Sequence, residues 1–517
     1  MNTPAPPSIH LPILFGLQAV KIFLTVAAVL VGYGLHRDEY LYLAEGSHPM
    51  WGYMEGPPMI GWVAGLSRLF LGSSVWAAKL PVLLVGLLCL YLLLKLVTEF
   101  GGGKYAQLIA GAAWLLSPAF LGTNYLFQPV SFNQLAWLAI GLALVRVVKY
   151  ERPKDWYLLG GIVGLALLTK YSVVFYLIAL FAGLLLSPQR KLFLQPKLWV
   201  AAGIAFVIWL PNLLWQWYYD FPVVTHMEEL ARTQLVNMST ADFLIPQIIF
   251  HGGSLFVWAP GLYWLLRNEK LRPYRFLGIA YPVLLLLLLA LSGKSYYMMG
   301  IYASLMAAGG LFWERILKEK SWWFLIMFTG NVFLMPFSIP ILPIEKMKAF
   351  GVYMRDQWNF SPPLRWEDGT VRDLRQDYAD MHGWEEMVQT VAEYYYALPE
   401  EERRNTMIYA GNYGQAGALA FFRKKYDLPE PYSFNASFIL WVPEEAAPFD
   451  RQIAVEDYPW GPSDFFESTE TLTVQQSPFA RETHHIYYLT GPTGDTQEAW
   501  RAVLEEQRRE RLGLGGE

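Results

Sequence analysis

The first two-thirds of the chain consists of long apolar runs that are separated by short polar loops. A membrane core about 30 Å thick needs roughly 20 apolar residues per helix. By this measure the sequence predicts eleven membrane-spanning segments. The segments are 11–34, 76–97, 104–122, 131–148, 156–169, 172–187, 198–216, 243–265, 276–291, 298–313 and 322–342.

Two of these segments, 156–169 and 172–187, depend on one polar sequence. Together they are too long for a single span and short for two. The sequence Thr169-Lys170-Tyr171-Ser172 interrupts them, so we expect two short helices that turn at this point. A single tilted helix is the alternative, and it would reverse the orientation of all later segments.

Residues 343–517 show a different pattern, in which helical and extended periodicities alternate. Helices are expected at 384–396, 415–426 and about 495–511, and strands at 406–410, 437–442 and 484–489. Such alternation is typical of an α/β domain. The sequence therefore predicts a mainly α, polytopic membrane helical bundle, residues 1–342, followed by a soluble α/β domain, residues 343–517.

Composition and charge agree with this division. The 517 residues are 54% hydrophobic and only 16% charged, whereas a soluble protein carries roughly a quarter charged residues. Residues 1–342 hold 23 Lys and Arg against 14 Asp and Glu, while residues 343–517 hold 17 against 30. Cys89 is the only cysteine, so the second domain must rely on its own apolar core instead of a disulfide.

The Lys and Arg bias of the short loops predicts the orientation. With the N-terminus in the cytoplasm, the inner loops hold 16 of these residues and the outer loops only six. An odd number of spans then places the C-terminal domain outside. Segment 11–34 has neither a preceding basic stretch nor a cleavage site, so we expect a first span and not a cleaved signal peptide. The sequence thus predicts a multi-pass protein of the plasma (inner) membrane, with a cytoplasmic N-terminus and an extracytoplasmic C-terminal domain.

The first outer loop, residues 36–72, carries the most chemistry. Asp38 and Glu39 follow directly on the first span, and Glu55 precedes two prolines. Apolar residues from 59 to 70 recur at helical spacing, which favours a helix lying in the membrane interface. Carboxylates at a membrane edge are costly unless they are solvated or used. Asp38 as a simple helix cap and Glu55 as a solvated turn residue are the plainer alternatives.

Other polar residues are expected at the same outer level. Lys170 and Tyr171 lie where segments 156–169 and 172–187 turn, and Lys294 lies where segment 276–291 ends. A lysine at a helix end more often only reaches for the interface. Together, however, acids and bases on one rim suit an anionic lipid-linked substrate, because a cation can hold phosphate while a carboxylate acts on the nucleophile.

The motifs of this loop resemble those of membrane glycosyltransferases. The pair Asp38-Glu39 after the first span resembles the acidic signature of the GT-C class. More closely, several ordered blocks are similar to bacterial members of glycosyltransferase family 39, which includes protein O-mannosyltransferases and the lipid A aminoarabinose transferase. The blocks are RDEYLYLAEG, WGYMEGPPMIGWV, LFQPVSFNQLAW, GLALLTKYS, GKSYYMMGIYASLMAAGG and GNYGQAGALAFF.

This resemblance implies a sugar donor on a polyprenyl phosphate and a lipid, glycan or protein acceptor at the outer face. It puts Asp38 in the place of the catalytic carboxylate, with Glu39 beside it. It leaves open the sugar, the acceptor and any need for a divalent cation, and membrane lipids are the only other partners implied. The residues expected to bind substrate are Arg37, Glu55, Asn133, Lys170, Tyr171, Lys294, Tyr296 and Tyr297.

Two positions depart from the family pattern. Asn133 stands where bacterial relatives are expected to carry Asp, which removes a second carboxylate. Glu55-Gly56 stands where relatives usually place His or Lys after the acid, which puts that loop's phosphate contact in doubt. Either change points to a different donor or to a weakened enzyme.

Other classes of function remain open on the sequence. A lipid or solute transporter is the main alternative, although no internal repeat is found and the charges gather at one face. A binding scaffold is the third interpretation. Gly411, Gly414 and Gly417 lack the spacing and acidic partner of a dinucleotide loop, so a tight turn is expected there. The eight histidines show no metal-ligand spacing, and no nucleic-acid partner is expected.

Overall fold

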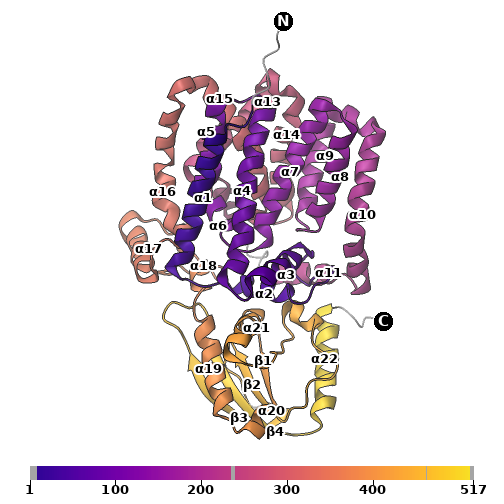
Figure 1. Ribbon diagram of the computed structural model, residues 1–517, viewed down its shortest axis with the longest axis vertical. Helices are drawn as coiled ribbons and strands as arrows, with labels where there is room; N and C mark the ends of the chain where they lie inside the picture. Colours follow the sequence, from indigo (N-terminus) through magenta and orange to yellow (C-terminus); the bar gives the residue numbers. More distant parts are fainter. Residues whose placement is uncertain (1–7, 234–238, 462, 513–517) are drawn as a thin grey trace. The chain divides into compact units, whose positions relative to one another are not determined.

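The computed structural model describes residues 8–233, 239–461 and 463–512. The chain is mostly helical, and one four-stranded sheet lies near its C-terminal end (Figure 1). Its internal contacts divide it into two compact units. The helical unit comprises Met1–Ala28, Lys79–Leu214 and Glu228–Ile341, and the mixed unit comprises Val29–Ala78, Trp215–Met227 and Leu342–Glu517.

Apolar helices with few charged residues build most of the helical unit. They are α1 (Leu11–Val31), α4 (Val75–Glu99), α5 (Lys104–Leu116), α6 (Pro118–Thr123), α7 (Pro129–Tyr150), α8 (Pro153–Leu167), α9 (Val173–Leu185), α10 (Pro196–Tyr218), α12 (Thr240–Ile249), α13 (Leu255–Arg267), α14 (Arg275–Ala290), α15 (Tyr302–Leu317) and α16 (Thr329–Leu334). The more polar helix α11 (Pro222–Thr233) follows α10. Helices α1, α4, α10 and α11 also contribute residues to the mixed unit.

Five helices in the described part of the chain are long and apolar enough to cross a membrane. The number rises to seven if two strongly bent helix pairs each count as one span. The expected break within residues 156–187 is confirmed, because α8 ends at Leu167 and α9 begins at Val173. The total of eleven spans stays a prediction, since several predicted segments form helices of only 13 to 16 residues.

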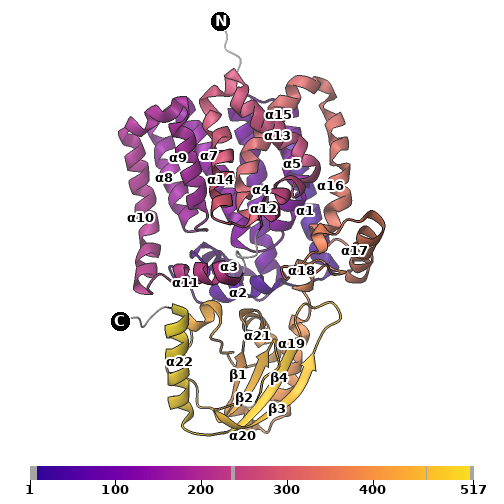
Figure 2. The same ribbon diagram turned by 180° about the vertical axis from the view of Figure 1, so that it is seen from behind.

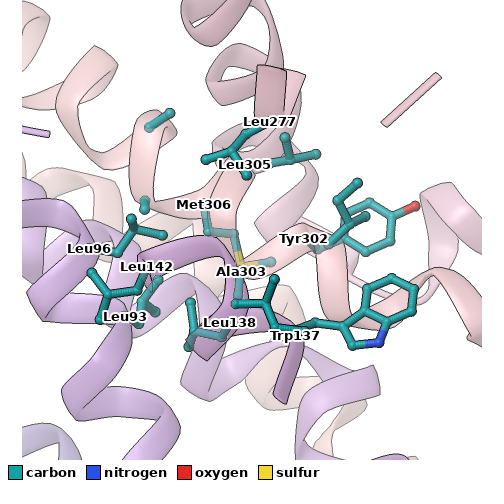
Figure 3. Packing of buried hydrophobic residues seen from close by; sticks show 14 of the residues in the cluster. Leu93, Leu96, Trp137, Leu138, Leu142, Leu277, Tyr302, Ala303, Leu305 and Met306 are labelled. Atoms are coloured by element: carbon teal, nitrogen blue, oxygen red, sulfur yellow. The ribbon is translucent and has the colours of Figure 1, made fainter. Parts of the chain in front are cut away.

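Close helix packing produces the core of the helical unit (Figure 3). Small residues let neighbouring backbones approach, as is common between membrane helices. A Cβ atom on Gly261 of α13 would lie 1.9 Å from the carbonyl oxygen of Leu305 in α15, and one on Gly309 would lie 1.9 Å from that of Val257. The buried side chains of this core include Leu93, Leu96, Trp137, Leu138, Leu142, Leu277, Tyr302 and Met306.

The mixed unit joins the first loop to the C-terminal part of the chain. Its helices are α2 (Arg37–Glu45), α3 (Met59–Leu71), α17 (Ile344–Trp358), α18 (Gln376–Ala379), α19 (Trp384–Ala397), α20 (Glu400–Arg404), α21 (Tyr413–Tyr426) and α22 (Thr496–Leu512). The strands are β1 (Thr406–Ala410), β2 (Arg451–Glu456), β3 (Phe466–Gln475) and β4 (His484–Pro492).

The sheet has the order β1-β2-β4-β3. Strand β1 runs parallel to β2, with Ile408 opposite Ile453, and the other pairs are antiparallel. Helices α19 and α21 lie on one face of this sheet, as the two opposite views show (Figures 1 and 2). The predicted α/β fold of the C-terminal part of the chain is therefore confirmed, and the domain boundary at residue 343 stays a prediction.

One local prediction in this unit is wrong, and two strands were missed. Residues 437–442 do not form a strand, because Ala436–Leu440 is a short 3-10 helix whose apolar side chains fill a small core. A short apolar run does not by itself distinguish a strand from a buried helical turn. Strands β2 and β3 were not predicted, and most of β3 is polar and exposed, which conceals the alternation of a strand. The helix expected at 59–70 is confirmed as α3.

Candidate active site

The start of α2 positions the acidic pair of the first loop. His36 is the N-cap, and its Nδ1 accepts a hydrogen bond of 3.1 Å from the backbone N–H of Asp38. The Glu39 carboxylate closes a capping box by accepting from the backbone N–H of His36 at 2.8 Å. Glu39 is fully buried in this role. The alternative in which Asp38 only caps the helix is wrong, because His36 provides the cap.

The Asp38 side chain faces a residue far away in the sequence. Its Oδ1 accepts a 2.9 Å hydrogen bond from the hydroxyl of Tyr413, the first residue of α21. Burial, followed by the charge of Asp38, raises the pKa of Tyr413 well above its usual value, so the phenol stays protonated and donates. The Asp38 side chain is 30% exposed. Tyr413 therefore holds this carboxylate while part of its surface remains accessible.

Arg37 lies over the same tyrosine. Its guanidinium carbon is 4.4 Å from the centre of the Tyr413 ring, and its NH1 is 3.1 Å from Oε1 of Glu482. Burial raises the pKa of Glu482, while the charge of Arg37 opposes that rise. The backbone N–H of Arg37 also donates to the carbonyl of Asp380 at 3.0 Å. Arg37 thus joins α2 to α21 and to the Glu482 loop.

Two glycines in the first turns of α21, Gly414 and Gly417, allow the close contact between α2 and α21. A Cβ atom on Gly414 would lie 2.7 Å from Cγ of Arg37, and one on Gly417 would lie 2.8 Å from the backbone of Tyr40. Of the three glycines expected to form a tight turn, Gly414 and Gly417 therefore lie in α21, while Gly411 precedes Asn412, the residue that caps the helix. Their glycines serve helix packing, which the sequence did not indicate.

Glu55 is bonded to the protein and is not simply solvated. Its Oε1 accepts from the backbone N–H of Ser437 at 2.8 Å, and its Oε2 accepts from the hydroxyl of the same serine at 2.5 Å. Glu45, at the end of α2, is buried beside it. Burial and the neighbouring Glu55 raise the pKa of Glu45 well above its usual value, so this carboxyl group favours its protonated form.

The predicted residues of the helical unit form a second group. Nζ of Lys170 lies 5.7 Å from the ring centre of Tyr296 and 5.8 Å from that of Tyr297. Lys294 is half-buried and precedes the short 3-10 helix Ser295–Ile301 that carries these tyrosines. The carbonyl of Lys294 accepts a hydrogen bond of 3.0 Å from the backbone N–H of Tyr297.

Asn133 lies next to the same turn. Its Nδ2 donates to Oγ of Ser172 at 3.2 Å, and its Oδ1 accepts from the indole N–H of Trp137 at 2.9 Å. Tyr171, one residue earlier, donates its hydroxyl hydrogen to Oδ1 of Asn212 at 3.2 Å. Asn133 is therefore a buried structural partner of the turn that carries Lys170.

Several polar residues were not singled out from the sequence. Tyr413, Glu482 and Asp380 became visible only through their contacts with α2. Lys21 could have been identified from the sequence, because it is a charged residue inside an apolar span. Its Nζ donates to the carbonyl of Asn124 at 3.0 Å. Lys79 is also buried, and its Nζ lies over the Tyr125 ring. The described residues contain no group of three or more His, Cys, Asp or Glu arranged to hold a metal ion.

Comparison with known proteins supports the resemblance read from the sequence. Residues 55–215 match the family model described as dolichyl-phosphate-mannose-protein mannosyltransferase. The lipid A galacturonosyltransferase RgtD of Rhizobium johnstonii is 27% identical over 255 residues, which are 47% of this chain and 53% of that protein. The match therefore spans about half the length of this curated relative.

The fold is shared with solved structures of ArnT from Cupriavidus metallidurans. The structure bound to undecaprenyl phosphate has a TM-score of 0.61 at 15% identity and covers 91% of this chain and 97% of that one. The apo structure has a TM-score of 0.55 at 14% identity and covers 90% and 97%. These findings confirm the GT-C fold and the resemblance to the family 39 type of membrane glycosyltransferase.

Proposed function

We propose that this protein transfers a hexosyl or pentosyl group from a polyprenyl-phosphate donor to a lipid, glycan or protein acceptor. The observation that carries the proposal is the partly exposed Asp38 carboxylate, which Tyr413 holds at the start of an α2 helix in the first loop. The sequence blocks shared with family 39 and the GT-C fold support it.

We assign Asp38 as the base that takes the hydroxyl proton of the acceptor. The acceptor oxygen attacks the anomeric carbon of the donor, the bond from that carbon to the phosphate oxygen breaks, and polyprenyl phosphate leaves. The hydroxyl proton of the acceptor passes to Asp38, which Tyr413 holds through Oδ1. Glu39, buried in the capping box, positions the helix that carries this carboxylate.

The leaving phosphate requires positive charge, because it gains charge as the bond breaks. We assign Lys170 and Lys294 to this task, with Tyr171, Tyr296 and Tyr297 as neighbours that shape the donor site. Arg37 is already paired with Glu482 and lies on Tyr413, so it stabilises the Asp38 surroundings. Glu55 is held by Ser437, and we assign it to anchoring the loop.

The names of two similar proteins narrow the range of donors and acceptors that we propose. RgtD is named as a lipid A transferase, and one ArnT structure holds undecaprenyl phosphate. By this likeness we propose a polyprenyl-phosphate donor and a lipid acceptor. Asn133, which stands in place of an expected Asp, indicates that the donor sugar differs from that of relatives with a second carboxylate. The transporter alternative finds no support in these comparisons.

We further propose that the reaction takes place at the outer face of the plasma membrane, with the N-terminus inside and residues 343–517 outside. The charge bias of the loops supports this orientation. Reporter fusions at residue 343 should be active outside the cytoplasm. Activity confined to the cytoplasm would contradict the orientation.

Lipid analysis tests the proposed activity directly. Lipids extracted from cells with and without the gene for this chain, and from cells that express Asp38→Asn, are compared by mass spectrometry. We expect one glycolipid to lose the mass of a single sugar in both deficient strains. Identical lipid and glycan profiles in the three strains would contradict the proposal.

A further inference from the structure

A separate cavity of about 350 Å³ lies within the mixed unit. It is lined by the C-terminal end of α2, the end of α3, the last turns of α21 and the residues around Tyr432 and Trp441. Helix α2 is nine residues long, so at about 1.5 Å per residue this cavity is roughly one helix length away from Asp38. The proposed transfer reaction makes no use of it.

Basic side chains dominate the polar lining of the cavity. Arg68, Arg423 and Lys424 line it together with a single carboxylate, Glu430, which pairs with Arg423. Arg68 is fixed by neutral oxygens, because NH1 donates to the carbonyl of Leu43 at 2.8 Å and also to the hydroxyl of Ser47. The balance of charge in the cavity is therefore positive, which suits an anionic ligand.

An aromatic wall completes the cavity. The rings of His48 and Trp441 are stacked, with their centres 4.3 Å apart and an interplanar angle of 10°. The indole N–H of Trp441 is buried and has no hydrogen-bond acceptor among the described residues. His48 already directs Nδ1 to the carbonyl of Ala44 at 3.2 Å. The wall thus offers a rigid aromatic surface beside the basic side chains.

The helix that supplies Arg68 also presents apolar side chains to its surroundings. In α3, Leu66, Leu69 and Phe70 are 61%, 76% and 77% exposed, and they flank Arg68 along the chain. A helix of this kind lies in the membrane interface, where lipid phosphates are found. We propose that the cavity binds the phosphate of an anionic phospholipid headgroup, with Arg68, Arg423 and Lys424 as the cations and the His48–Trp441 stack as the adjoining wall.

Cysteine labelling reports on the occupancy of this cavity. The only native cysteine, Cys89, is buried, so a cysteine at the exposed, cavity-lining Ser73 gives a specific signal. The full-length Ser73→Cys protein is placed in nanodiscs of phosphatidylcholine alone or with phosphatidylglycerol, and a water-soluble maleimide is added. We expect several-fold slower labelling with phosphatidylglycerol, while Ser468→Cys on the exposed side of β3 is labelled at the same rate in both.

Neighbouring lysines provide a matched pair of variants. In the Ser73→Cys background, Lys424→Ala should weaken the protection about five-fold, because a basic residue near an anionic membrane contributes about 1 kcal/mol. Arg423→Gln should act in the same direction. Lys425→Ala should leave the protection unchanged, since Lys425 pairs with Glu385 and does not line the cavity.

Three outcomes would overturn the proposal. One is equal labelling of Ser73→Cys in the two kinds of nanodisc. A second is equal behaviour of the Lys424→Ala and Lys425→Ala variants. A third is full protection by inorganic phosphate in phosphatidylcholine nanodiscs, which would assign the cavity to free anions and not to a lipid. Because the readout is labelling and not sugar transfer, the result does not depend on the proposed enzymatic activity.

Discussion

The hydroxyl of Tyr413 donates a 2.9 Å hydrogen bond to Oδ1 of Asp38, across 375 positions of the sequence. The bond connects the first helix of the first loop to the helix that follows β1. Arg37 lies on the ring of the same tyrosine, so two consecutive residues of α2 depend on one residue of α21. The carboxylate at the centre of the proposed reaction is thus positioned by the C-terminal part of the chain.

Asp38→Asn should abolish most of the transfer activity and leave folding intact. A lost general base typically lowers the rate by about 10²–10⁴, and the amide keeps the shape of the side chain and still accepts from Tyr413. Turnover of purified protein with a short-chain donor is measured beside thermal unfolding. Asp368→Asn, an exposed residue of the mixed unit, is the control and should keep full turnover. Full turnover in Asp38→Asn would leave this residue without a catalytic role.

Tyr413→Phe should lower kcat while the KM for the donor stays unchanged. A hydrogen bond to a charged group contributes about 1.5–3 kcal/mol, which corresponds to roughly 10- to 100-fold in rate. The Tyr413 hydroxyl holds Asp38 and not the donor, so binding of the donor should not change. Tyr396→Phe, whose hydroxyl donates to the carbonyl of Asp427 at an exposed position, is the control. An unaltered kcat would show that Tyr413 only packs.

Lys170→Ala and Lys294→Ala should each reduce turnover more than donor binding. Loss of one group that stabilises developing charge lowers the rate by about 10², because the positive charge acts mainly as the phosphate leaves. Single-turnover kinetics and donor binding separate the two effects. Lys346→Ala, an exposed lysine of α17, serves as the control. Wild-type turnover in both variants would show that neither lysine holds the leaving phosphate.

Gly414→Ala should destabilise the mixed unit. The added Cβ would lie 2.7 Å from Cγ of Arg37 and 2.7 Å from Cη2 of Trp384. Overpacking of this kind costs about 1–3 kcal/mol, so the midpoint of thermal unfolding should fall, and transfer activity should fall with it because α2 is displaced. Gly494→Ala, where a Cβ meets nothing within 4 Å, should have no such effect. Equal stability of the two variants would contradict the close packing of α2 on α21.

Glu456→Gln should change how stability depends on pH. Burial, followed by the charge of Asp457, raises the pKa of Glu456 from 4.5 to about 8. A raised carboxyl pKa means that the folded state favours the protonated form, so this contribution to stability is complete below pH 4.5 and is lost as pH rises to about 8. Glutamine resembles the protonated form, so the variant should unfold at a higher temperature than wild type near pH 8, but not near pH 4.5.

The control for this experiment is Glu470→Gln on the exposed side of β3, which should follow the wild-type profile. A Glu456→Gln curve parallel to wild type across this range would show that the carboxyl titrates normally in the folded protein.

The sequence by itself determined the class of the protein and the identity of the acidic motif. Hydropathy and loop length are local properties, so they predicted the apolar helices, the break between α8 and α9, and the helix α3. The family blocks located Asp38 because a motif is a local string of residues.

Only the tertiary structure decided how that motif is used. The roles of Tyr413 on Asp38 and of Ser437 on Glu55 depend on contacts between distant segments. The same applies to Gly414 and Gly417, which the sequence assigned to a tight turn and which the structure places against α2. Such contacts arise from the packing of one element on another, and no local pattern of hydrophobic and polar residues records which distant side chain will fill a given space.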